Sequence, residues 1–113
     1  SSEYLDDINI AVHQSRDKNN RDPKVGVGNT KSKFMITFKA KFSKSTDHCA
    51  VFLSTGGSLD FCCNIHVNHD KEDYRVLVEK NNLRGNVAFF LYPIDMLGTV
   101  LNRQELGSIT LRR

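Results

Sequence analysis

The 113-residue sequence contains no tryptophan and three cysteines, and no apolar run approaches the ~20 residues that a membrane-spanning helix needs. We therefore expect neither an integral membrane protein nor a membrane partner. Three cysteines are too few for the disulfide-dense scaffold of many small secreted proteins, and their odd number leaves at least one thiol unpaired within the chain. The sequence also lacks a Gly-rich phosphate loop, a nucleophile elbow and a zinc-protease helix, which disfavours an enzyme and a bound cofactor.

The composition that remains is that of an ordinary globular domain. Hydrophobic residues make up 39% and charged residues 26% of the chain, which excludes pervasive disorder. At this length there is room for one domain, which we expect to cover residues 1–113.

Alternation of apolar and polar residues predicts an antiparallel β fold. Residues 34–42 alternate without a fault, which is typical of a strand with one buried and one wet face. Residues 86–92 are apolar on both faces and predict a central strand covered on both sides, which Pro93 would end. Residues 94–104 could carry a short helix. Further strands are expected over residues 8–13, 49–54, 59–68, 74–80 and 108–112.

About seven such strands predict an all-β single domain, an antiparallel β-sandwich or flattened barrel. In residues 59–67 we expect the odd-numbered side chains, from Leu59 to Val67, to point inward. The predicted core consists of Phe34, Ile36, Phe38, Phe42, Phe61, Ile65, Val76, Val78, Phe89 and Leu91.

Residues 15–33 are polar and basic, and we expect them to form a long connection. From Arg16 to Lys44 the chain carries nine basic and two acidic residues, a net charge of +7, so the remainder carries −4. Lys39 and Lys41 share the wet face of their strand, with Lys33 close by, which predicts a contiguous basic stripe. Because the phenylalanines of that strand point to its other side, the stripe lacks base-stacking rings, and a solubilising face is the alternative to phosphate binding.

Two arrangements of the cysteines Cys49, Cys62 and Cys63 follow from the hairpin around Gly56-Gly57. A two-residue turn, which Gly-Gly favours, keeps Cys49 and Cys63 out of register. A turn one residue longer places them opposite each other, where a Cys49–Cys63 disulfide is geometrically feasible. The alternative to a bridge is three reduced, core-type cysteines.

His66, His69 and Glu72 are the candidate metal ligands. A His-x-x-His pair followed by Glu near a strand end offers ligands that suit zinc and related metals. The cupin metal motif is similar in residue types but uses His-x-His, a spacing that this sequence does not have. A solvated loop is the alternative interpretation.

The segment Tyr74–Val87 resembles the strand–turn–strand segment of small fungal guanyl-specific ribonucleases, a fold that many secreted effectors of powdery mildews share in degenerate form. The resemblance covers fourteen residues of the 113. No histidine follows Val87 where that family keeps its catalytic one, so the resemblance implies a ribonuclease-like effector without ribonuclease activity.

The chain as a whole resembles the small secreted avirulence effectors of plant-pathogenic fungi, of the compact cupin-like β-sandwich type described in rusts. The resemblance lies in the size, the all-β pattern, the start at Ser1, which fits a removed signal peptide, and the missing catalytic motifs. It implies a secreted virulence protein that binds a host protein and is recognised by an immune receptor. The implied partner-binding residues are exposed ones: Gln104, Arg103, Glu105, Lys39, Lys41 and Lys33.

A second resemblance is to the single-strand RNA-binding replicase proteins of coronaviruses. Tyr92, Leu101-Asn102-Arg103 and Leu106-Gly107-Ser108 are similar to the tail of that small β-barrel, although its Gly-x-x-x-Gly dimer helix is not reproduced.

With the missing catalytic motifs, the effector resemblance predicts a non-enzymatic protein-interaction domain. A single-strand RNA-binding barrel and a carbohydrate- or metal-binding cupin-like module remain the alternatives.

Overall fold

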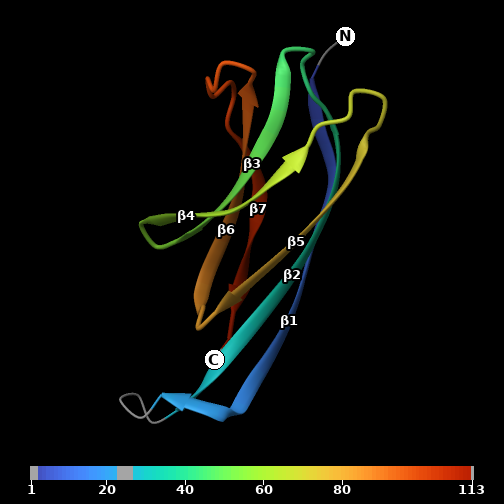
Figure 1. Cartoon of the computed structure of the whole chain (residues 1–113). Helices are drawn as coiled ribbons and strands as arrows, with labels where there is room; N and C mark the ends of the chain where they lie inside the picture. The colour runs from blue at the N-terminus through green and yellow to red at the C-terminus, as the bar shows by residue number, and fades with distance from the viewer. Residues whose placement is uncertain (1–2, 23–26, 113) are drawn as a thin grey trace.

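The computed structural model describes residues 3–22 and 27–112, and within them the side chains of residues 3–16 and 30–112. The described residues form seven antiparallel strands in two sheets and no helix, which confirms the expected all-β, sandwich-like fold (Figure 1). The strands are β1 (Tyr4–Asp22), β2 (Val27–Lys41), β3 (Thr46–Thr55), β4 (Ser58–His66), β5 (Asp73–Asn81), β6 (Gly85–Asp95) and β7 (Gln104–Leu111).

The first sheet has the strand order β1-β2-β5, and the alternation in β2 builds its inner face. Every second residue from Phe34 to Ala40 is buried. Their cross-strand neighbours in β5, every second residue from Tyr74 to Val78, are buried as well. The prediction of one buried and one wet face for this part of the sheet is therefore confirmed.

The second sheet has the strand order β4-β3-β6-β7 and supplies the other half of the core. Every second residue from Cys49 to Leu53 in β3 and from Val87 to Leu91 in β6 is 0% exposed. Phe34 and Phe89 meet edge to face between the sheets, with ring centroids 5.0 Å apart. Such pairing adds roughly 0.5–1.5 kcal/mol to the burial of the rings, so this contact helps to hold the two layers together.

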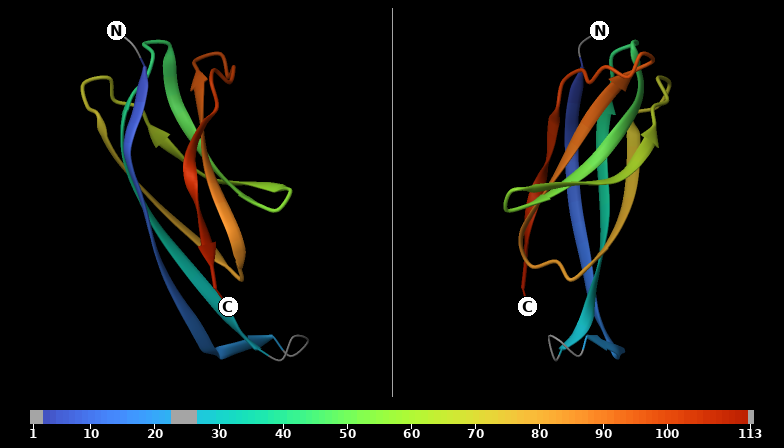
Figure 2. Two further views of the ribbon diagram at one scale, coloured as in Figure 1. Left: turned by 180° about the vertical axis from the view of Figure 1, so that it is seen from behind. Right: turned by 60° about the vertical axis from the view of Figure 1, so that its left-hand side comes forward.

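The predicted long connection over residues 15–33 is wrong. Residues 15–22 belong to β1 and residues 27–33 to β2, and the strand expected at 8–13 is the middle of a much longer one. Main-chain pairing between two strands needs no apolar side chain, so a polar sequence can extend a hairpin. Figure 2 shows this hairpin reaching beyond the rest of the molecule. With the hairpin, the molecule measures 53 × 27 × 21 Å.

The short helix expected near residues 94–104 is also absent from the described chain, and Pro93 does not end its strand. β6 continues to Asp95 through its pairing with β3. Its pairing with β7 stops at Leu91, so the missing N–H of Pro93 costs no hydrogen bond to β7. The Pro93 carbonyl instead accepts a hydrogen bond from the Leu101 amide at 2.8 Å. The chain then makes a tight turn in which the Asp95 carboxylate accepts hydrogen bonds from the Leu97 and Thr99 amides at 2.9 and 2.8 Å.

A β-bulge at Cys62 contradicts the prediction that all odd-numbered side chains of β4 point inward. Near the Gly56-Gly57 turn the register is the two-residue one, with Phe52 opposite Phe61, but Val51 then pairs with Cys63. One extra residue on β4 reverses the alternation at that point. Leu59 and Phe61, expected in the core, are therefore 47% and 50% exposed.

The two-residue turn keeps Cys49 and Cys63 out of register, as one of the two predicted cysteine arrangements requires. Cys49 lies opposite Ile65, and Cys49, Cys62 and Cys63 are all free thiols, so the Cys49–Cys63 disulfide is not formed. Among the other predicted core residues, Phe42 and Ile65 are partly buried against the core. No helix within the described ranges is long and apolar enough to cross a membrane.

Candidate functional site

The outer face of the four-stranded sheet carries a cluster of aromatic and apolar side chains, which we call the aromatic face. Phe52 lies between the buried Val51 and Leu53 and therefore points away from the core. Its ring packs edge to face on Phe61 and Tyr92, with centroid distances of 5.5 and 4.8 Å. The members of the aromatic face are Phe52, Leu59, Phe61, Phe90, Tyr92 and Ile94.

The bulge at Cys62 completes this surface. Without the extra residue, the alternation that places Ile65 and Cys63 inward would place Phe61 and Leu59 inward too. Bulges commonly re-aim a side chain in this way. The result is an edge strand whose two largest apolar side chains near the turn face solvent beside Phe52.

The β7 side of the aromatic face is formed by two of the predicted contact residues, Arg103 and Glu105. The Arg103 guanidinium lies 4.7 Å from the centroid of the Phe90 ring, within cation–π range. Glu105 is exposed and lies opposite Phe90, whereas Gln104 is half-buried and lies opposite the buried Leu91, on the inner side of the sheet. The structure therefore brings Arg103 and Glu105, but not Gln104, to the rim of a surface that sequence reasoning did not find.

The turn after β6 extends the apolar surface. Met96 and Leu97 at its tip are 86% and 90% exposed, and Val100 pairs with Ile94 of the aromatic face through an isolated bridge. The two hydrogen bonds to Asp95 hold this turn in shape. Its apolar tip is consequently presented by an ordered backbone and covered by no described part of the chain.

The lysines of the predicted basic stripe lie on the outer face of the other sheet, where acidic side chains accompany them. Lys39 is 3.9 Å from the Asp7 carboxylate, and Lys33 pairs across the strands with Glu79. Lys31 forms a 3.0 Å ion pair with Glu79, and this hydrogen bond lowers the pKa of the Glu79 carboxyl. Lys41 is exposed near the end of β2. The side chains of Lys18, Arg21 and Lys24, counted in the same basic segment, lie outside the described residues.

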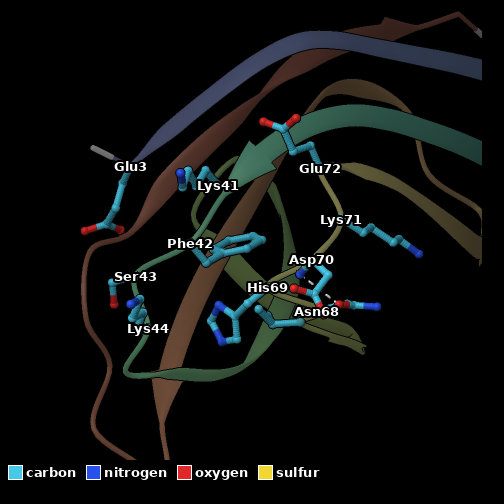
Figure 3. Close-up of a pocket in the computed structure, with 11 residues that line it drawn as sticks. Glu3, Lys41, Phe42, Ser43, Lys44, Asn68, His69, Asp70, Lys71 and Glu72 are labelled. Carbon is cyan, nitrogen blue, oxygen red and sulfur yellow. Dashed lines mark hydrogen bonds between the residues drawn. The ribbon is translucent and has the colours of Figure 1, made fainter. Parts of the chain in front are cut away.

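A pocket of about 740 Å³ opens where the β2–β3 and β4–β5 loops meet (Figure 3). Its lining mixes three lysines with three carboxylates, so it offers no charge preference. Phe42 lies on its floor and packs on Tyr74, with ring centroids 5.4 Å apart. The lining residues are Glu3, Lys41, Phe42, Ser43, Lys44, Val67, Asn68, His69, Asp70, Lys71 and Glu72.

The structure does not bring the candidate metal ligands together. His66 pairs across the strands with His48, whereas the ring of His69 hydrogen-bonds through Nε2 to the Thr46 carbonyl at 3.1 Å. Glu72 is exposed at the end of the β4–β5 loop. Within the described ranges, no group of three or more His, Cys, Asp or Glu side chains is arranged to hold a metal ion.

The cysteines are poorly suited to nucleophilic chemistry. Burial raises the pKa of the Cys49 thiol to about 12 and that of Cys62 to about 11, and it raises the pKa of Cys63 as well. The reactive form of cysteine is the thiolate, which these shifts suppress at neutral pH. The thiols therefore act as small apolar side chains.

No family model matches the chain, and neither a curated protein nor a solved structure shows significant similarity to it.

Proposed function

We propose that this chain is a non-enzymatic binding domain that recognises a protein partner through the aromatic face. The observation that carries the proposal is the outward placement of Phe61 and Leu59 beside Phe52. Contiguous apolar patches on a soluble domain commonly mark interaction sites, and aromatic residues and Arg are enriched in protein–protein interfaces.

The two outer faces of the sandwich differ in chemistry, which supports this choice of surface. The outer face of the three-stranded sheet carries lysines with acidic partners, as expected of a solvated surface. The aromatic face instead exposes rings in mutual contact, with Arg103 and Glu105 of opposite charge on its rim. A partner that buries this face would remove apolar area from water and leave the rim charges at the wet edge.

The arrangement of the rings favours a protein over a stacked sugar or base. Phe52 is tilted by 72° from Phe61 and by 67° from Tyr92, so neighbouring rings present edges as well as faces. Such a surface is uneven and suits interdigitating side chains. Extended stacking on successive bases would also need cationic charge that tracks a phosphate backbone.

If the chain acts like the secreted fungal effectors that it resembles, its partner is a host protein or an immune receptor. Arg103 and Glu105 would then lie at the edge of the contact. Arg103 is the residue we expect to contribute most at this rim, because its guanidinium already covers Phe90 and can donate further hydrogen bonds outward.

The test compares immobilised wild-type protein with two single variants in quantitative affinity capture. Phe61→Ser removes an exposed ring from the aromatic face. Leu77→Ser removes a 66% exposed apolar side chain from the outer face of the other sheet and serves as the matched control. We expect a partner that is captured by the wild type and by Leu77→Ser but lost with Phe61→Ser. Capture that depends on neither residue, or on Leu77 alone, contradicts the proposal.

A further inference from the structure

Basic side chains gather at the end of the molecule opposite the pocket, which we call the basic end. It includes residues of both sheets and is separate from the aromatic face. Its members are Arg16, Arg84 and Arg112.

Main-chain contacts connect the part of this end that belongs to the three-stranded sheet. Arg16 lies opposite Thr30, and the Thr30 carbonyl accepts a hydrogen bond from the Asn82 amide at 2.7 Å. Lys33, three residues further along β2, faces the other side of the sheet, opposite Glu79. The distal part of the β1–β2 hairpin is thereby tied to the turn that follows β5.

The same turn leads to the four-stranded sheet. Arg84 directly precedes Gly85, the first residue of β6, and Gly85 lies opposite Leu111 at the end of β7. Arg112 is the next residue. Arg84 and Arg112 are therefore neighbours at the strand ends, although 27 residues separate them along the chain.

All three side chains are exposed, and none of them forms an ion pair with another described residue. Lys31 and Lys33 are also nearby, but Glu79, 3.0 Å from Lys31 and opposite Lys33, offsets their charge. The planar guanidinium group of arginine matches phosphate oxygens in a two-pronged geometry.

The opposite end of the molecule is acidic, so charges of opposite sign are separated along the length of the molecule. The pocket end gathers more carboxylates than cations among the described residues, in a molecule that is 53 Å long. Charge separated over such a distance steers a polyanion to one end and repels it from the other. The carboxylates of this end are Glu3, Asp6, Asp7, Asp47, Asp70, Glu72, Asp73, Asp95 and Glu105; its cations are Lys39, Lys41, Lys44, Lys71, Arg75 and Arg103.

We propose that the basic end binds the phosphate backbone of a nucleic-acid duplex. A duplex presents about one charge per 1.7 Å of its axis, the densest array of phosphates that a rigid basic surface can meet. A single strand is the less suitable ligand, because the exposed rings that could stack its bases lie on the aromatic face. Phe90 lies beside Glu105, about 20 Å along β7 from Arg112.

This inference does not depend on the proposed function, since the two surfaces share no residue. Binding at the basic end would leave the aromatic face free for its partner. It also differs from the stripe expected from the sequence, since Lys33, Lys39 and Lys41 all lie outside the basic end.

The experiment measures fluorescence anisotropy of a labelled 16-base-pair DNA duplex with the full chain between 50 and 200 mM salt. Three phosphate contacts predict a slope of about −2.7 in a plot of log affinity against log salt, which corresponds to roughly a fortyfold loss over this range. The double variant Arg84→Gln/Arg112→Gln is expected to reduce the slope to about a third. The variant Arg84→Lys/Arg112→Lys, which keeps both charges, should retain most of it.

The matched control is Lys39→Gln/Lys41→Gln, which removes the same two charges at the other end of the molecule. We expect it to change the affinity by less than about threefold, because those charges lie far from the bound duplex relative to the ~10 Å screening length. Four results overturn the proposal: no binding at 50 mM salt, equal losses in the two glutamine variants, tighter binding of the single strand of the same length, or binding of a heparin oligosaccharide without binding of the duplex.

Discussion

The register of β4 predicts a large difference between two chemically identical substitutions. Phe34 and Phe61 are both assigned to the core by sequence alternation alone, but Phe34 is 1% and Phe61 50% exposed. Phe34→Ala should therefore be far more damaging than Phe61→Ala, because only the first removes a ring that is enclosed on all sides.

The expected magnitudes follow from the buried area. A phenylalanine side chain buries up to about 200 Å², so Phe61 buries about half of that, and its removal costs about 1–2 kcal/mol once the compactness of the unfolded chain is considered. Phe34 fills the space between the sheets against Phe89, and its truncation leaves a cavity. Large-to-small substitutions of buried phenylalanines cost about 3–5 kcal/mol.

Urea unfolding of both variants, monitored by circular dichroism and extrapolated linearly to water, measures the two free energies of unfolding. We expect Phe61→Ala to keep at least about 1 kcal/mol more stability than Phe34→Ala. Equal losses would refute the reasoning, since they would mean that Phe61 points into the core and that β4 has no bulge at Cys62.

Three other predictions concern the turn after β6, Gly107 in β7 and the buried thiol of Cys49. Asp95→Ala should cost about 1 kcal/mol and speed amide exchange at Leu97 and Thr99, because it removes two hydrogen bonds; unchanged exchange would show that the carboxylate does not order the turn. Gly107→Ala should cost about 1–3 kcal/mol in thermal unfolding, because Gly107 has φ +140° and an added Cβ would lie 3.3 Å from the Ile10 Cδ1 atom. Cys49 has its pKa raised from 9.0 to about 12, so its thiol should resist a thiol reagent in the folded protein at pH 8. As pH rises, the Cys49 thiol loses its proton in the unfolded chain before it does so in the folded protein. The free energy of unfolding should therefore fall between about pH 9 and 12, and Cys49→Ala should flatten that decline.

Much of the fold could be predicted because alternation works wherever a strand has one buried face. Residues 34–42 and 74–80 fulfil that condition, and their inward positions are correct up to the half-buried Phe42. The β1–β2 hairpin could not be predicted in the same way. Its distal part is held by main-chain pairing between polar residues, which leaves no hydrophobic signal in the sequence.

The aromatic face could not be predicted, because a bulge has no signature in the alternation pattern. Leu59, Phe61, Cys63 and Ile65 read as one uninterrupted face, yet the extra residue at Cys62 divides them between the two sides of the sheet. The one available signal was the doubly apolar run at 86–92. It indicated a strand covered on both sides, whereas Phe90 and Tyr92 lie half-buried on an outer face that no described part of the chain covers.

The measurement that tests the central claim most directly is the affinity of the captured partner for two leucine variants, determined by titration calorimetry. Leu59→Ser alters the aromatic face and Leu77→Ser the opposite outer face, and both side chains are exposed in the free protein. We expect Leu59→Ser to weaken binding at least tenfold, a loss of about 1.4 kcal/mol, with Leu77→Ser unchanged. Equal affinities for the two variants would contradict the account and move the binding surface away from the aromatic face.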